Sequence, residues 1–190
     1  MPNDKNEVYV YKLTLVKEYR PKDKSKYVSL LERHPRFDEL YANPEHTELA
    51  MHAYREYSLS DTQDGQAFVV YCHIKEREGD ELCFHSQACG ITGWYTHEND
   101  PTSAGMYWTA LIKKVRGTGA FRTLIDELVK TLPEEVTTLY EVTLTEAPVK
   151  SFQRAGFKVV TDPDEILRAK QAAGVVNEHT VLALPIRRQK

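Results

Sequence analysis

The feature that most constrains this chain is a glycine turn between a β-rich segment and a helical one, within Met106–Leu128. Residues 106–115 (MYWTALIKKV) carry the aromatic and branched side chains that favour a half-buried strand. After the turn RGTG, Leu124, Ile125 and Leu128 recur on one helix face. A turn of this kind brings backbone N–H groups and the positive end of a helix dipole together, which predicts a site for phosphate oxygens.

A single RGxG turn also occurs where glycine serves only the backbone, so the rest of the chain has to distinguish a phosphate site from an ordinary connection. Strand patterns cover residues 8–16, 67–75, 82–95, 106–115, 138–144, 157–160 and 180–186. Helical patterns cover residues 27–34, 44–57, the segment from the turn to Leu132–Pro133, and 149–155, while 162–173 is helical or irregular. Gly90 and Gly93 predict an interruption of the third strand, and residues 97–103 predict a turn.

Composition narrows the class of protein. The 190 residues predict one domain, and 41% hydrophobic with 28% charged residues is ordinary for a globular protein. The net charge of -3 argues against nucleic acid as the main partner. No apolar run reaches the roughly 18 residues that a membrane helix needs. The first seven residues are polar, and we expect a cytoplasmic protein without membrane association.

Three cysteines, Cys72, Cys83 and Cys89, lie near several histidines, which raises the question of zinc. The paired ligand spacing of zinc sites is absent from the sequence. Buried free thiols are the preferred interpretation, and no metal is expected.

Two motifs resemble those of one family. RGTGAFRTLIDEL is similar to the R/Q-x-x-G-x-G/A loop and following helix of the GNAT superfamily of acyl-CoA-dependent N-acyltransferases, and SFQRAGF is similar to its short C-terminal helix ending in Gly-Phe. The order of predicted elements resembles the family over nearly the whole chain. The resemblance implies an α/β (α+β) fold in one domain spanning residues 1–190, with a mixed central sheet flanked by helices in the order β-α-α-β-β-β-α-β-α-β-β.

The resemblance also implies where coenzyme A would bind. If the motif is aligned as Arg116-x-x-Gly119-x-Phe121, Leu124 and Ile125 fall where the family has its first buried helix residues. If it is aligned as Lys114-x-x-Gly117-x-Gly119, these two residues come two positions too late. In the first reading, Phe121 replaces the usual Gly or Ala. The pantetheine arm would pair with the strand end and the pyrophosphate would bind the turn. The implied residues are Leu111, Ile112, Lys113, Arg116, Gly117, Thr118, Gly119, Ala120, Phe121 and Arg122. Lys114 is a further candidate for the phosphates.

Acetyl transfer to an amine requires a base, because a lysine-like amine with a pKa of about 10.4 is protonated at pH 7. Some family members carry a Glu where this chain has Gly105. The candidates here are therefore Glu98, then Tyr107 and Glu141. The family's proton-donating Tyr corresponds to Phe152, and Tyr140 or Tyr107 could substitute for it.

The resemblance implies an N-acetyltransferase that uses acetyl-CoA as donor and a primary amine as acceptor, with a homodimer left open. Asp38, Glu39, Glu45 and Glu48 would suit a cationic acceptor or are a solvated helix face. Phe121, Phe152 and Gly105 favour the alternative of a non-catalytic acyl-CoA-binding or interaction protein on the same fold. An unrelated α/β protein with a chance glycine turn is the third hypothesis.

Overall fold

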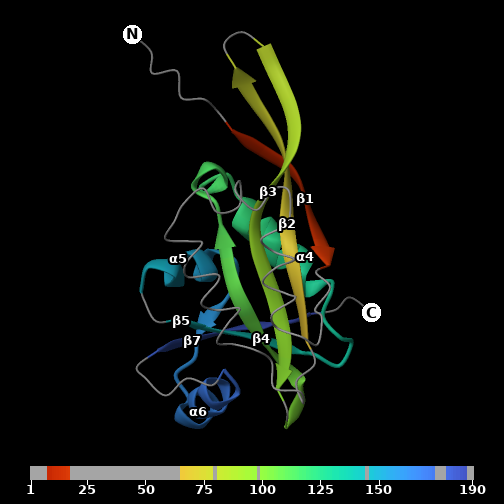
Figure 1. The fold of residues 1–190 in the computed structure, drawn as a ribbon. Helices are drawn as coiled ribbons and strands as arrows, with labels where there is room; N and C mark the ends of the chain where they lie inside the picture. Colours follow the sequence, from red (N-terminus) through yellow and green to blue (C-terminus); the bar gives the residue numbers. More distant parts are fainter. Residues whose placement is uncertain are drawn as a thin grey trace, which may run out of the picture. The chain divides into compact units, whose positions relative to one another are not determined.

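The computed structural model describes residues 8–17, 65–78, 81–97, 99–143, 146–173 and 179–187 (Figure 1). Its elements in chain order are β1 (Tyr9–Lys17), β2 (Gly65–Glu78), β3 (Glu81–His97), β4 (Asp100–Leu111), the 3-10 helix η1 (Lys113–Val115), α4 (Ala120–Val129), β5 (Thr138–Thr143), α5 (Glu146–Arg154), β6 (Lys158–Val159), α6 (Pro163–Ala172) and β7 (Thr180–Pro185). The helices predicted for 27–34 and 44–57, with the acidic residues Asp38, Glu39, Glu45 and Glu48, lie outside the described residues.

The chain divides into two compact units. Unit one comprises Met1–Ser58, Phe68–Ile91 and Trp108–Glu127, and unit two comprises Leu59–Ala67, Thr92–Tyr107 and Leu128–Lys190. Because β3 and β4 contribute to both, the strand order is β1-β2-β3-β4 in unit one and β3-β4-β5-β7-β6 in unit two. The mixed sheet with helices confirms the predicted fold class. That residues 1–190 act as one domain stays a prediction.

In unit one, the core lies on one face of the β1–β2 ladder. The two strands are antiparallel, and their inward positions meet in register, as at Val10 with Ile74 and Leu13 with Cys72. The alternation of buried residues along β2 is what a strand with one covered face requires. Leu124 of α4, which is fully buried, belongs to the same cluster. The buried residues of α4 therefore pack on this face, and Figure 1 shows α4 beside β1 and β2.

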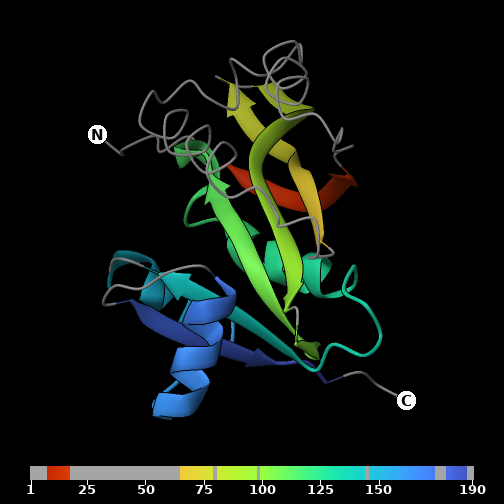
Figure 2. The same cartoon turned by 60° about the horizontal axis from the view of Figure 1, so that its bottom comes forward.

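In unit two, β5 is the central strand. It pairs with β4 in parallel at Ser103–Gly105 and with β7 antiparallel along its whole length, and β6 extends the sheet from β7. Both α5 and α6 contact β5 and β7, as Figure 2 shows. The parallel register with β4 ends at Gly105 and Tyr140, although both strands continue. The printed β4–β5 pairing therefore covers only the start of β5.

Several predicted boundaries were wrong. β4 starts at Asp100, so most of the predicted turn 97–103 is strand; the Asp100 carboxylate bonds the Thr102 amide and hydroxyl and the Ser103 hydroxyl. β4 ends at Leu111, and the next three residues form η1 rather than strand. β3 runs without a break through Gly90 and Gly93. Helix α6 stands between β6 and β7, where residues 162–173 were predicted to be helical or irregular and the predicted element order left the helix out.

Candidate functional site: a glycine turn with open amides

The turn between η1 and α4 depends on its two glycines. Gly117 has φ of 81° and Gly119 has φ of 87°, which is the left-handed region that other residues adopt only with strain. A Cβ added to either glycine would meet no atom of the described residues within 4 Å. The glycines are therefore required by backbone conformation, and no described side chain fills the space beside them.

Hydrogen bonds close this turn from within. Arg116 N–H donates to the carbonyl of Lys113, and the Thr118 hydroxyl donates to the carbonyl of Val115 at 2.7 Å. Among the described residues, no group accepts a hydrogen bond from the backbone N–H of Gly117, Thr118 or Gly119. Three amide donors thus stand together directly before a helix N-terminus, which is the arrangement that binds phosphate oxygens.

The Phe121 side chain, which departs from the family pattern, is accommodated in the core. It is partly buried and packs against the cluster that contains Leu111, Val115 and Leu124. Leu124 and Ile125 are fully buried, as the register starting at Arg116 predicts. The bulk of Phe121 therefore points into the packing of α4, and the glycine turn stays open.

Some backbone groups of residues 111–113, the segment expected to pair with pantetheine, already form hydrogen bonds within the protein. Ile112 N–H donates to the Cys89 carbonyl at 2.8 Å, and Arg116 Nε donates to the Leu111 carbonyl at 2.9 Å. Since successive N–H groups of a strand point to opposite sides, the Leu111 N–H faces away from β3. That amide is the better-placed donor for an added strand-like ligand, whereas the Ile112 N–H already serves the sheet.

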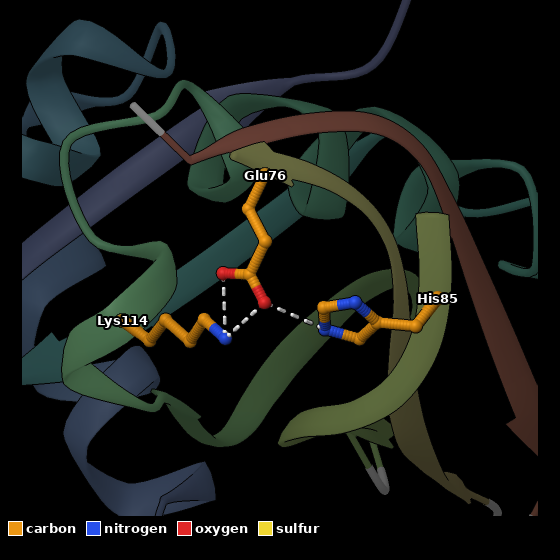
Figure 3. A network of polar contacts seen from close by, with 3 residues as sticks. All are labelled: Glu76, His85 and Lys114. Carbon is orange, nitrogen blue, oxygen red and sulfur yellow. Dashed lines mark hydrogen bonds and ion pairs between the residues drawn. The ribbon is translucent and has the colours of Figure 1, made fainter. Parts of the chain in front are cut away.

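Basic side chains near the turn differ in their partners. Lys114 is bound to Glu76, which lies on β2, with Nζ at 2.8 Å from both carboxylate oxygens (Figure 3). Arg122 Nε lies 3.3 Å from Asp126 one helical turn on, and both side chains are more than half exposed. In the described part of the chain, no acidic group pairs with exposed Lys113. Lys113 and Arg122 are thus better placed than Lys114 to meet a phosphate.

The described residues that were expected to move protons belong to unit two. Glu98 is outside the described residues, and Tyr107 belongs to β4 with an undescribed side chain. At Gly105 a Cβ would stand 2.2 Å from Cζ and 2.3 Å from the hydroxyl oxygen of Tyr95. The Tyr95 ring therefore fills the space that a carboxylate-bearing side chain would need at position 105. Sequence reasoning missed Tyr95, although an aromatic residue opposite a glycine on the neighbouring strand is a known pairing.

The family's proton-donating Tyr is also replaced, in this chain by Phe152. Phe152 is 4% exposed, and its ring packs edge-on against Phe157 with centroids 5.2 Å apart. Tyr140 donates a 2.8 Å hydrogen bond to Glu165, and burial together with that bond raises the pKa of Tyr140 to about 12. Tyr140 therefore holds its proton more tightly than an ordinary tyrosine does, which makes it a poor substitute for the acid.

Among the described carboxyl groups, that of Glu141 has a clearly raised pKa. It follows Tyr140, the last β5 residue paired with β4. No described group donates a hydrogen bond to its carboxyl. The residue is half-buried, and burial raises the pKa of its carboxyl to about 8. A carboxyl that gains and loses its proton near neutral pH has the property that a general base needs.

The cysteines do not belong to a metal-binding group in the described ranges. Cys72 and Cys89 are buried free thiols, and their mutual hydrogen bond, with burial, raises the pKa of Cys72. No three His, Cys, Asp or Glu side chains gather as metal ligands within the same ranges. In that part of the chain, no helix is long and apolar enough to cross a membrane.

A mixed sheet with helices, together with a glycine turn whose three amides donate to no described group, defines the class as an α+β protein with a strand–turn–helix joint. Comparison with solved structures narrows the class, whereas no family model and no curated protein matches the chain. The structure is similar to an acetyltransferase of the GNAT family from Staphylococcus aureus Mu50, with 12% identity, TM-score 0.50, and 93% of this chain and 100% of that chain covered.

Two further acetyltransferases are similar over nearly the whole chain. The one from Thermus thermophilus has 17% identity and TM-score 0.50, covering 94% of this chain and 99% of that chain. The one from Streptococcus agalactiae 2603 has 15% identity and TM-score 0.51, covering 92% of this chain and 98% of that chain. The chain therefore has the fold of GNAT-family acetyltransferases, as its two motifs predicted.

Proposed function

We propose that this protein is an N-acetyltransferase that transfers the acetyl group of acetyl-CoA to a primary amine. The observation that carries the proposal is the turn at Gly117–Gly119, with three amides open and no side chain in the way. The pyrophosphate of coenzyme A would accept hydrogen bonds from these amides at the N-terminus of α4. Lys113 and Arg122 would add positive charge beside it.

The pantetheine arm would lie along the end of β4. It carries amides and pairs with a strand edge as a peptide does. The Leu111 N–H faces the side of β4 away from β3, and Ala120 and Phe121 begin the helix on which the phosphates rest. A strand N–H on this edge would also stabilise the oxyanion that forms at the thioester carbonyl during attack.

The reaction needs a base for the ammonium proton. Two carboxylates compete for this role: Glu98, directly after β3, and Glu141, which follows the last β5 residue paired with β4. Tyr107, on β4, is the third candidate. Thiols have an ordinary pKa of about 8.5, so coenzyme A can leave as the thiolate without a dedicated acid. The packed position of Phe152 is compatible with that route.

A non-catalytic acyl-CoA-binding protein is the second candidate function. Two observations favour it: Tyr95 fills the space of a side chain at Gly105, and Phe152 offers no proton donor. Both functions need the glycine turn, so donor binding alone does not separate them. They differ in whether coenzyme A is released when an amine is present.

One pair of measurements tests both candidates. Acetyl-CoA at about 100 times its dissociation constant should raise the unfolding free energy by roughly 2.7 kcal/mol, seen as a thermal shift. Release of free thiol is then followed with polyamines, amino acids, aminosugars and lysine-containing peptides. Binding with release supports the transferase, and binding without release across the panel supports the non-catalytic protein. No thermal shift up to millimolar acetyl-CoA would exclude both.

A further inference from the structure

A buried carboxylate lies outside the proposed binding turn. Glu76, near the end of β2, is 8% exposed, and both of its oxygens lie 2.8 Å from Lys114 Nζ. His85 on β3 approaches the same carboxylate, with Nε2 3.4 Å from Oε1. Figure 3 shows the lysine and the histidine reaching Glu76 from different elements of unit one. Sequence reasoning placed Glu76 in a charged turn, whereas it belongs to β2, and considered His85 only as a possible zinc ligand.

The position of Glu76 is unusual for a charged residue. Val70, Cys72, Ile74 and Glu76 occupy alternate, inward-facing positions of β2, and the first three are fully buried. The pattern would therefore predict another apolar side chain at position 76. A buried carboxylate is tolerated when it is paired and hydrogen-bonded, and the pairing here comes from a residue 38 positions later in the chain.

The partner of Glu76 belongs to the segment that sets the glycine turn. Lys114 is the central residue of η1, which joins the end of β4 to Arg116. Two side-chain contacts of this segment are local, namely Arg116 Nε with the Leu111 carbonyl and the Thr118 hydroxyl with the Val115 carbonyl. Just before η1, the Ile112 N–H donates to the Cys89 carbonyl of β3. The Glu76–Lys114 pair adds a side-chain link from the centre of η1 to β2.

We propose that Glu76 is a positioning residue, which holds η1, and through it the Gly117–Gly119 turn, in the geometry that binds the phosphates of acetyl-CoA. Lys114 then serves as the link between the sheet and the turn, and not as a phosphate ligand. The inference rests on the proposed function, since it concerns the same donor. It assigns to β2 a role in donor affinity that neither family motif contains.

The test compares two donors that share the thioester and the pantetheine arm. Acetyl-CoA carries the phosphates and the nucleotide, and S-acetyl-pantetheine lacks both. Glu76→Gln keeps the shape of the side chain and removes its charge. The partly exposed Lys114 can then turn to water, so we expect the variant to fold. Dissociation constants for both donors are measured by calorimetry in wild type and variant.

If Glu76 positions the turn, Glu76→Gln should weaken acetyl-CoA binding by about tenfold to a hundredfold, as misplacement by a remote mutation can do. Binding of S-acetyl-pantetheine should stay unchanged, because that donor does not use the turn. Lys114→Arg, which keeps a cation for Glu76, should retain acetyl-CoA affinity. Glu81→Gln, at an exposed carboxylate on β3, is the matched control and should change neither constant.

Two results would overturn the inference while leaving the proposed function intact: unchanged acetyl-CoA affinity in Glu76→Gln, or an equal loss for both donors, which would indicate general loosening. If Glu76→Gln does not fold, Glu76→Asp, which keeps the charge but shortens the side chain, gives the same ratio of constants. Wild-type protein that binds no acetyl-CoA would overturn the proposed function and the inference together.

Discussion

The glycine turn of unit one and the β5–α5 region of unit two both contain residues that differ from the family pattern. The structural consequences of these differences are opposite in the two regions. In the turn, Phe121 replaces a small residue, yet its side chain packs inward and the amides stay open. In unit two, Phe152 is packed against Phe157, and Tyr95 fills the space beside Gly105. The proposed donor binding by backbone amides would thus tolerate the change at Phe121, whereas proton transfer would depend on side chains that differ from the family pattern.

Because of this contrast, donor binding and turnover need to be measured separately, since an activity assay alone does not distinguish a loss of one from a loss of the other. Binding of acetyl-CoA tests the turn, and turnover tests whichever side chains now move protons. Each variant below is therefore read in both assays. A variant that changes only one of them sharpens the contrast, and one that changes both would break it.

The largest effect is expected for the general base. If Glu98 takes the proton of the amine, Glu98→Gln should lower turnover at neutral pH by about 10² to 10⁴, the usual contribution of general-base catalysis. Acetyl-CoA affinity should hardly change. Turnover is measured as thiol release with an acceptor found by the amine screen, and affinity by thermal shift.

Glu141→Gln is the matched variant for this experiment, because it removes the competing carboxylate in the same way. Loss of turnover in Glu141→Gln with full turnover in Glu98→Gln would transfer the role to Glu141. Full turnover in both variants would leave Tyr107, or water acting on the small neutral fraction of the amine.

The next effect concerns the turn itself. Gly119→Asp should weaken acetyl-CoA binding by at least about tenfold, because a carboxylate would stand among phosphate oxygens of like charge. Gly119→Asn is the control, since Asn has nearly the same shape, carries no charge and tolerates the left-handed conformation comparably. Both variants need circular dichroism to show that they fold. Equal affinities for Asp and Asn would mean that phosphates do not bind at this turn.

The sequence predicted the parts of this fold that depend on local pattern. The burial of Leu124, Ile125 and Leu128, and the turn before them, follow from periodicity and from the conformational freedom of glycine. The predicted end of β4 was wrong because the side chains of Lys113 to Val115 favour a strand. In the structure, the hydrogen bond from Arg116 N–H to the Lys113 carbonyl closes a 3-10 turn there.

Contacts between distant residues could not be predicted in the same way. The Glu76–Lys114 pair and the Tyr95 ring over Gly105 depend on which strands are neighbours and in what register. A single sequence contains no direct signal for either. The proposed donor site lies within one strand–turn–helix segment and was therefore predictable. Which carboxyl can act as a base depends on burial by residues distant in the sequence, as the raised pKa of Glu141 illustrates.

The last effect is expected on stability and not on activity: a pH dependence of the unfolding free energy, which decides whether the Glu141 carboxyl is enclosed as a base would need to be. Burial raises the pKa of Glu141 to about 8 from an ordinary value of 4.5. Between these values the folded state keeps a proton that the unfolded state releases, so this group lowers the unfolding free energy as pH rises. The slope is at most about 1.4 kcal/mol per pH unit, and the effect levels off above the folded pKa.

Glu141→Gln removes this titration and keeps the neutral shape. The unfolding free energy of the variant minus that of wild type should therefore be near zero at the acid end of the window and rise steadily toward pH 8. Urea unfolding at a series of pH values measures it, with Glu134→Gln, at an exposed carboxylate, as a control whose difference stays flat. A flat difference for Glu141→Gln would mean that the carboxyl is solvated and ordinary. A rising difference together with turnover that increases through pH 8 would identify a buried carboxyl that works as the base once it is ionised, placed on β5 beyond the last residue paired with β4.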